Sequence, residues 1–356
     1  MAKDVPGATP QPPMPMWYLP IMLAAALASL ALAITLPFSD YVAWQSGAGT
    51  DMVHARWVYE RLHFDRSPIA VALIGSSRME AGLSPHALSA DFAKRLGHPT
   101  PVVNLSIFRP GRDLQSAIVD QLLATHPEVR TIVLADDGFM ANSHPMYQAT
   151  ASPRAIVSEP LLINTSWFTS VMALPYRSLR NFAAQQAPAL FGVTLGFDPS
   201  DYAGPAFDRT EGYVLPSGEA RNGNRHKTQA KLASEVKYIL AFQNQGLVGR
   251  VPFLPQSWQY AVDIDYTRRI AEAAHHAGVP IAFVSLPAYG PDRIKGDRRL
   301  YCRYGPDFDL GFLSAHPSYY QDGLHLNHDG AMAASAALAD RLTPMLASGK
   351  LTFGPC

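Results

Sequence analysis

Cysteine and excess charge are both scarce in this chain. Only two of its 356 residues are cysteine, Cys302 and Cys356, and no CxxC spacing occurs, which excludes a disulfide framework and a cysteine-based metal site. The 29 basic and 29 acidic side chains give no net charge, so no basic field indicates nucleic acid as a partner. We expect no cofactor and no metal. One Cys302–Cys356 bridge is a hypothesis that depends on an exported location.

Internal repeats are absent as well. No motif recurs at a period of about 20 to 50 residues, which argues against solenoids and propellers. Hydrophobic residues make up 48% of the sequence and charged residues 16%, so a chain of this length can bury a large core. The composition predicts one large domain, or one domain that carries an insertion.

The longest stretch without charge lies near the N-terminus. No Asp, Glu, Lys or Arg occurs between Asp4 and Asp40. The apolar run Trp17–Phe38 exceeds the roughly 20 residues that a membrane-spanning helix needs. A cleaved signal peptide is the alternative, because Ala31–Ala33 resembles a cleavage site. The long, proline-rich start with a single lysine favours an uncleaved anchor.

The chain on either side of this anchor is predicted from the same reasoning. Residues 1–16 form a flexible tail, and residues 39–66 form a linker helix that leads away from the membrane. Long domains that follow one N-terminal span are translocated largely regardless of charge. We therefore expect a bacterial inner-membrane protein with one span and a globular domain in the periplasm.

From residue 67 onward, apolar runs alternate with helical patterns. The runs "IAVALIG", "TPVVNLS", "VRTIVLADDGF" and "VPIAFVSLPAY" predict buried strands, and segments such as "SPHALSADFAKRL" predict helices between them. Strands separated by helices imply crossovers and a parallel sheet. The alternation stops over about 140–258 and then resumes. The sequence therefore predicts an α/β domain over 67–356 with a large insertion.

Residues typical of nucleophilic catalysis follow the first strand and precede the last helix. The segment "VALIGSSRMEAGLSP" places Gly75, Ser76 and Ser77 where a strand of a parallel sheet ends. The structural alternative is that these serines only cap the next helix. The segment "DGLHLN" carries Asp322 and His325. A serine becomes a nucleophile when a histidine takes its proton and a carboxylate orients that histidine.

These segments together resemble the SGNH, or GDSL-type, hydrolase superfamily. The resemblance covers about half of the chain and is specific at its two ends. It implies a flavodoxin-like three-layer α/β/α sandwich with a parallel sheet that performs acyl-ester hydrolysis or acyl transfer. It also implies Ser77 as nucleophile, His325 as base and Asp322 as the carboxylate that orients it. Ser76 then occupies the place of the family's aspartate and is the alternative nucleophile.

The resemblance is looser for the groups that would stabilise an oxyanion. Gly111 in "FRPGRD" corresponds to the glycine of the second family block. In the third block "ADDGFMAN" replaces Gly-x-Asn-Asp, so the usual asparagine is missing at its place. Asn142 or a backbone N–H near Asp137 is the expected substitute. Arg78 is expected to pair with a buried carboxylate such as Asp137, or else to bind a substrate carboxylate.

The anchor and the insertion add a resemblance in architecture. Anchored SGNH-like proteins accompany membrane-bound O-acyltransferases in alginate or cellulose acetylation and in teichoic acid alanylation. This implies an O-acyltransferase or esterase that acts on O-acetyl groups of an exported polysaccharide. Its partners would be a membrane-bound O-acyltransferase or a polysaccharide synthase complex. The alternative is a non-catalytic accessory protein that binds the polymer or the acyltransferase.

Three further interpretations of the same residues stay open. The segment Asp322–Asp329 holds two histidines and two aspartates that are suitable ligands for Zn or Mn. The pair Asp136 and Asp137 suggests a glycosidase, although adjacent residues of a strand point in different directions. Aromatic residues of the insertion are candidates for stacking on sugar rings, namely Trp167, Phe168, Tyr176, Trp258 and Tyr260.

Overall fold

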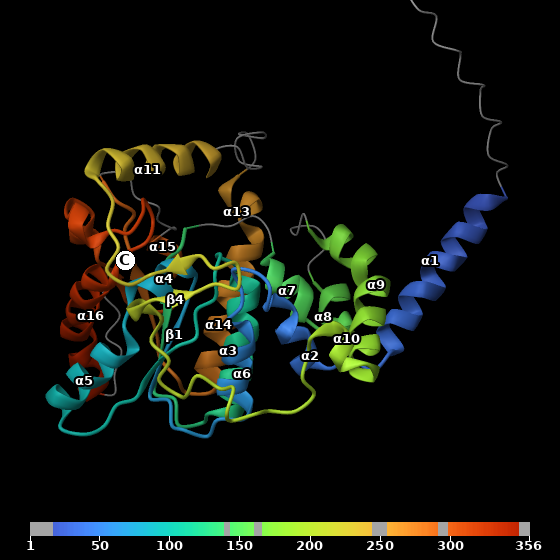
Figure 1. Cartoon of the computed structure of the whole chain (residues 1–356), viewed down its shortest axis with the longest axis horizontal. Helices are drawn as coiled ribbons and strands as arrows, with labels where there is room; N and C mark the ends of the chain where they lie inside the picture. Colours follow the sequence, from blue (N-terminus) through green and yellow to red (C-terminus); the bar gives the residue numbers. More distant parts are fainter. Residues whose placement is uncertain (1–16, 139–142, 160–165, 244–254, 291–297, 349–356) are drawn as a thin grey trace, which may run out of the picture.

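The computed structural model describes residues 17–138, 143–159, 166–243, 255–290 and 298–348 (Figure 1). Its centre is a sheet of five parallel strands in the order β2-β1-β3-β6-β7. The strands are β1 (Val71–Ile74), β2 (Val102–Asn104), β3 (Thr131–Ala135), β6 (Ile281–Ser285) and β7 (Asp307–Asp309). Counted among themselves they run 2-1-3-4-5, so the chain reverses its direction across the sheet between β1 and β3.

Side chains of the central strands alternate between two buried clusters, one on each face of the sheet. On β1, Ala72 and Ile74 pack into one cluster, while Val71 and Leu73 pack into the other. Strands β3 and β6 divide their side chains in the same way. A strand buried on both faces reads as a continuous apolar run, which explains why the predicted strands over these three segments are confirmed.

Helices cover both faces of the sheet. One face packs against α3 (Ala55–His63), α6 (Arg112–Thr125) and α14 (Ala261–His276). The opposite face packs against α4 (Ser77–Gly82), α5 (Pro85–Leu96) and α16 (His328–Ser348). Helix α5 confirms the helix predicted over "SPHALSADFAKRL", and it has Ser84 as its N-cap and Pro85 in its first turn. The α/β class with a parallel sheet flanked by helices is therefore confirmed.

The predicted linker helix over 39–66 is wrong in its shape and in its role. The chain forms α2 (Asp40–Trp44), the 3-10 helix η1 (Gln45–Gly47) and α3 instead of one helix. The intervening "SGAGT" contains two glycines, which disfavour a continuous helix. Trp44, Trp57 and Leu62 are buried in the core. This segment is therefore part of the domain and not a spacer.

The apolar N-terminal run forms helix α1 (Tyr18–Thr35), which lies against the edge of the domain (Figure 1). Its length and hydropathy suit a membrane anchor or a signal sequence. Nearly all of its side chains are exposed, and Ala33 alone is buried.

In the C-terminal part of the chain, Cys302 is disulfide-bonded. The chain's second cysteine, Cys356, lies outside the described residues.

The segment between β3 and α14 forms several short elements around the sheet. Helices α7, α8, α9 and α10 lie on the side of α1, whereas α11 lies over the opposite end of the molecule (Figure 1). Their bounds are α7 (Pro145–Thr150), α8 (Pro153–Val157), α9 (Trp167–Gln186), α10 (Pro188–Phe191), η2 (Arg209–Glu211), β4 (Tyr213–Val214), β5 (Ala220–Arg221), α11 (Gln229–Gln243) and α13 (Gln256–Gln259). Strands β4 and β5 form an antiparallel hairpin.

The remaining short elements follow β6. They are α15 (Arg298–Tyr301), η3 (Gly311–Ala315) and η4 (Pro317–Tyr319).

Candidate active site

Ser77 lies at the carboxyl end of β1, where the chain turns into α4. Gly75 makes this turn possible, because a Cβ there would lie 2.5 Å from the Cβ of Ala135 on the neighbouring strand. Ser76 is the N-cap of α4, and its hydroxyl accepts the backbone N–H of Arg78 at 3.2 Å. The capping role falls on Ser76, which leaves the Ser77 hydroxyl for another contact.

That contact is His325, 248 positions further along the chain. The Ser77 Oγ lies 2.8 Å from His325 Nε2. The Nδ1 of the same ring lies 2.9 Å from both carboxylate oxygens of Asp322. A carboxylate only accepts hydrogen bonds, so Nδ1 carries the proton and the lone pair of Nε2 faces the serine. The structure brings the three residues expected to form the triad into one hydrogen-bonded chain.

Asp322 is held in its ionised form by the groups around it. Burial is the largest single influence and would raise the pKa of its carboxyl, but the charge and the hydrogen bond of His325 lower that pKa. The backbone N–H groups of Leu324 and His325 donate to Asp322 Oδ1 at 2.8 and 2.9 Å and lower the pKa further. The pKa of Asp322 therefore lies well below its ordinary range. An ionised carboxylate at this place can stabilise an imidazolium on His325.

Helix α11 clamps the loop that carries Asp322 and His325. A Cβ on Gly323 would lie 2.9 Å from the backbone nitrogen of Val236, so the helix backbone packs directly on the loop. Glu235 Oε2 accepts the backbone N–H of Gly323 at 3.1 Å, and Lys227 Nζ lies 2.8 Å from Glu235 Oε1. The sequence analysis missed this clamp. Its residues lie in two segments that share no motif.

Asp137 supports the turn at Ser76. Its carboxylate accepts the backbone N–H of Ser76 at 3.0 Å and the Ser76 hydroxyl at 2.6 Å. Among the described residues no ion pair joins Arg78 to Asp137, so the expected role of Arg78 beside a buried or substrate carboxylate stays a prediction. Asp136 is buried beside it and accepts the backbone N–H of Gly138 at 3.1 Å. Both aspartates therefore bond to the local turn, and these contacts add no support to the glycosidase interpretation.

Gly111 and Asn142 were the expected oxyanion-hole residues of the central blocks. Gly111 is the N-cap of α6, and a Cβ there would lie 2.5 Å from the Cβ of His144. Within the described segments no hydrogen bond joins Gly111 to Ser77, so its expected role stays a prediction. Asn142 lies outside the described residues.

The loop after β2 reaches the site through Phe108, which the sequence analysis did not single out. The Phe108 ring lies nearly parallel to the His325 ring, with centroids 6.5 Å apart. The backbone carbonyl of Phe108 accepts a hydrogen bond from His144 Nε2 at 2.9 Å. His144 Nδ1 in turn accepts the backbone N–H of Met146 at 3.0 Å. Burial outweighs these contacts and lowers the pKa of His144 to about 4. A neutral His144 therefore positions Phe108.

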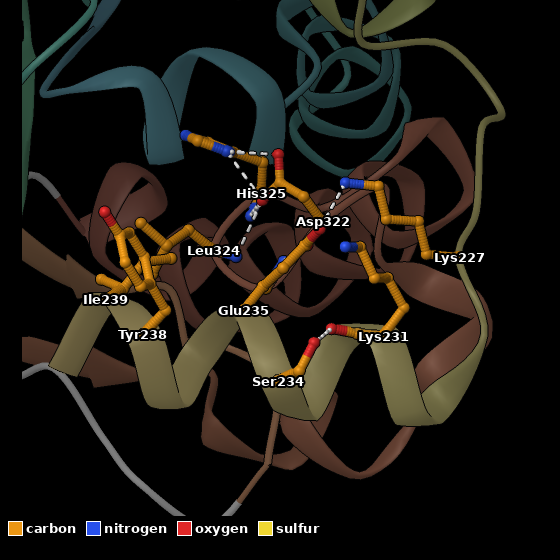
Figure 2. Close-up of a pocket in the computed structure, with 10 residues that line it drawn as sticks. Lys227, Lys231, Ser234, Glu235, Tyr238, Ile239, Asp322, Leu324 and His325 are labelled. Carbon is orange, nitrogen blue, oxygen red and sulfur yellow. Dashed lines mark hydrogen bonds and ion pairs between the residues drawn. The ribbon is translucent and has the colours of Figure 1, made fainter. Parts of the chain in front are cut away.

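Two adjoining pockets open beside Asp322. The first, of about 460 Å³, lies between α11 and the loop of Asp322 and His325 (Figure 2). The second, of about 450 Å³, shares Lys227 and Asp322 with the first. Five basic side chains line them, namely Arg221, Arg225, His226, Lys227 and Lys231. In the part of the chain that the structure describes, Arg225 and Lys231 form no ion pair.

The structure adds little support to the predicted metal site at Asp322–Asp329 or to stacking of sugar rings on the aromatic residues. His328 begins α16, and its Nδ1 lies 3.3 Å from Thr210 Oγ1. Across the described ranges, the group with suitable spacing for a metal is a different one, namely His86, Asp208 and Glu211. None of the five aromatic residues expected to stack on sugar lines either pocket, whereas Tyr238 of α11 lines the first. Trp167, Phe168 and Tyr176 belong to α9 instead.

No protein-family model matches the chain, and no curated protein matches it significantly. What the site can do is therefore argued from its geometry.

Proposed function

We propose that this chain is an SGNH-type serine O-acyltransferase or esterase that faces the periplasm from the inner membrane. The observation that carries the proposal is the continuous hydrogen-bonded chain from Ser77 Oγ through His325 to Asp322, with contacts of 2.8 and 2.9 Å. The distances and the order of groups meet what an activated serine requires. Capping alone would not require a histidine at Ser77, because Ser76 already caps α4.

The chemistry follows from this order of groups. The Ser77 oxygen attacks the carbonyl carbon of an acyl ester while its proton moves to His325 Nε2. The C–O bond of the leaving alcohol then breaks, and His325 returns the proton to that oxygen. Water or a sugar hydroxyl next attacks the acyl carbon while His325 takes its proton, the bond from that carbon to Ser77 Oγ breaks, and His325 returns the proton to Oγ. Water gives an esterase and the sugar hydroxyl gives a transferase.

An oxyanion forms in both halves of this reaction and needs hydrogen-bond donors. The backbone N–H of Ser77, at the first turn of α4, is the first donor that we assign. The second donor comes from the loop after β2, which approaches the site at Phe108. These assignments belong to the proposal.

The fold supports the same class. The strand order 2-1-3-4-5 is that of flavodoxin-like sheets, and ligands of such sheets bind where the strand order reverses. Ser77 follows β1, which adjoins that reversal. Ser76, at the family's aspartate position, is hydrogen-bonded to Asp137 in the segment that departs from the third family block. Ser76 and Asp137, which both lie where the sequence departs from the family pattern, therefore contact each other and support the same turn.

Two observations support the proposed location. Helix α1 is exposed along almost its whole length and is long enough to anchor the chain in a bilayer. The disulfide at Cys302 suits an oxidising compartment such as the periplasm.

The pockets support a polar polymer as the substrate. Figure 2 shows Lys227 and Lys231 of the α11 region directed toward the Asp322 end of the first pocket. Lys227 is paired with Glu235, whereas Lys231 and Arg225 form no ion pair among the described residues and can bind carboxylate, phosphate or hydroxyl-rich ligands. We therefore propose an exported polysaccharide as the acyl donor or acceptor, with a membrane-bound O-acyltransferase or a polysaccharide synthase complex as the partner.

The test is intact-mass analysis of the full chain in detergent after exposure to a fluorophosphonate. We expect one covalent adduct on the wild-type protein and none on Ser77→Ala. Ser158→Ala is the matched control, because Ser158 is exposed and, among the described residues, its hydroxyl bonds only to the carbonyl of Ala155. This variant should keep the adduct.

The opposite result would favour the accessory protein. A folded wild-type protein that forms no adduct has no activated serine, and its role would then be binding of the polymer or of the acyltransferase. An adduct that survives in Ser77→Ala and disappears in Ser76→Ala would transfer the nucleophile to Ser76.

A further inference from the structure

Helix α9 has its apolar and polar faces reversed. Its large apolar side chains face outward, with Phe168 66%, Met172 62% and Tyr176 74% exposed. The buried side of the helix consists of small or polar residues apart from one leucine, namely Ser170, Leu174, Ser178, Asn181 and Ala184. A helix at the surface of a water-soluble domain normally buries its apolar side chains and exposes its polar ones. The outward face of α9 is therefore suited to an apolar surrounding.

The same helix is also divided along its axis. Its first ten residues, 167–176, contain no charged side chain, and its second half begins with Arg177 and also carries Arg180. The exposed apolar residues 168, 172 and 176 repeat every four positions, so they form one stripe along the uncharged half. Trp167 and Tyr176 stand at the two ends of that half. Such aromatic side chains are enriched where a membrane meets water.

The position of α9 beside α1 identifies the apolar surrounding. The two helices pack against each other (Figure 1). The polar half of α9 lies where α1 ends: Asn181 exchanges hydrogen bonds with the backbone of Ser39, at 2.9 and 3.0 Å, and Gln185 donates to the carbonyl of Pro37. The Arg177 guanidinium lies 5.5 Å from the centre of the Phe38 ring. Arg177, which also donates to the backbone carbonyls of Gln148 and Ala151, therefore lies level with the point where the chain leaves α1.

We propose that the uncharged half of α9 is a second membrane contact, which dips its apolar stripe into the lipid–water interface beside α1. The occupant of this surface is a phospholipid bilayer, because the stripe adjoins the helix that anchors the chain. An interfacial helix of this kind buries its apolar face by about 5–10 Å, with basic side chains at the headgroups. The small residues Ser170, Ser178 and Ala184 let α9 pack closely on the protein behind it.

Two contacts with the bilayer fix the orientation of the domain on the membrane, whereas one anchor does not. A single helix lets the domain rotate about its end, whereas α1 and α9 together set how the domain sits on the membrane. Helix α11 and the pockets then keep a constant orientation to the membrane surface. The inference rests on the membrane location in the proposed function and not on its acyl chemistry.

The experiment measures the surroundings of single spin labels on the full chain in vesicles of phosphatidylethanolamine and phosphatidylglycerol. Met172→Cys is labelled with a nitroxide, and its collisions with oxygen, which concentrates in lipid, are compared with those with a water-soluble nickel chelate. Phe168→Cys is a second site on the stripe. Met332→Cys is the matched control, because Met332 is also a helical methionine, 41% exposed, but lies on α16. Ala26→Cys in α1 reports whether the anchor is inserted.

We expect an oxygen-to-nickel collision ratio that is several-fold higher at residues 168 and 172 than at residue 332. If the collision ratio is equal at residues 172 and 332 while it is high at residue 26, the proposal is overturned. A protein partner on α9 would then be favoured. A low ratio at 26 would overturn it as well, because α1 would not be in the bilayer. The serine adduct is measured separately, so a failure of this inference is distinguishable from a failure of the proposed chemistry.

Discussion

The serine and the histidine of the candidate triad are held by different parts of the molecule. Ser77 follows a central strand of the sheet, and its turn is fixed by the close contact at Gly75 and by the hydrogen bonds between Ser76 and Asp137. His325 lies in a loop outside the sheet. That loop is held by its own backbone hydrogen bonds to Asp322 and by α11 from the insertion.

This difference assigns a role to the insertion. The sheet alone places a serine at an exposed strand end, but a base must reach it from another segment. Helix α11 covers the loop that supplies the base and also lines the first pocket. The insertion is therefore part of the site, and changes on the two sides should have different effects. Changes on the histidine side should alter rate, and changes on the serine side should alter stability first.

The largest effect is expected for Asp322→Asn. An amide in place of the carboxylate favours the wrong tautomer of His325, and loss of this carboxylate in a serine triad costs about 10⁴-fold in rate. We expect the rate of fluorophosphonate labelling to fall about 10³- to 10⁴-fold. Asp329→Asn is the control, since Asp329 is exposed at the start of α16. Wild-type labelling of Asp322→Asn would show that His325 acts without this carboxylate.

The next effect concerns pH and His144, which positions Phe108 beside His325. Its pKa is about 4 in the folded chain because it is buried, against 6.5 when it is free, so the unfolded chain binds this proton first. The stability that neutral His144 contributes is fully present above pH 6.5 and is lost as pH falls toward 4. A shift of this size corresponds to about 3 kcal/mol.

Urea unfolding of the wild type and of His144→Gln checks this expectation. Between about pH 7.5 and about pH 4.5 the wild type should lose about 2 to 3 kcal/mol more than the variant, because glutamine does not titrate. Parallel losses in the two proteins would mean that His144 is already charged in the folded chain.

A smaller loss is expected on the serine side for Asp137→Asn. The change weakens two hydrogen bonds from Ser76, one of which joins a hydroxyl to a carboxylate at 2.6 Å. Hydrogen bonds to a charged group contribute about 1.5–3 kcal/mol, so we expect the free energy of unfolding to fall by about 2 kcal/mol. The labelling rate should fall less than tenfold. A normal unfolding midpoint with a large loss of rate would reverse the assignment of the two sides.

The sequence predicts the sheet better than the elements around it. Four strands were predicted because their continuous apolar runs need burial on both faces. Strand β7 was not predicted, since "DFD" contains two aspartates, is only half-buried and has no apolar run. The linker over 39–66 was predicted as one helix, whereas the structure divides it at a segment that contains two glycines. Short strands and breaks of this kind depend on tertiary packing.

The candidate site divides in the same way. Ser77, Asp322 and His325 were found because each belongs to a short motif with a chemical reason. The contacts that hold them were not found: the hydrogen bond from Gly323 to Glu235 joins residues 88 positions apart, and Phe108 reaches His325 from a loop without a motif. Such pairs depend on where the insertion folds back, and a single sequence holds no local sign of it.

The smallest effect, and the sharpest test of the comparison, is expected for Gly323→Ala. The added Cβ would lie 2.9 Å from the backbone nitrogen of Val236, so α11 and the loop must move apart. His325 would shift relative to Ser77 although no triad side chain is altered. Because a misplacement of about 1 Å at a reacting centre costs up to about 100-fold, we expect labelling to slow by about 10-fold. Gly196→Ala is the control, since nothing lies within 4 Å of its added Cβ.

A second change should reveal whether the loss arises from the clamp. Glu235→Gln removes the charge from the acceptor of the Gly323 N–H and from the partner of Lys227. If Gly323→Ala has already moved the loop off α11, adding Glu235→Gln should cost nothing more, and the two changes together should slow labelling no more than Gly323→Ala alone. Multiplied losses would instead mean that Glu235 acts on the pocket, and α11 would then serve the substrate and not the position of His325.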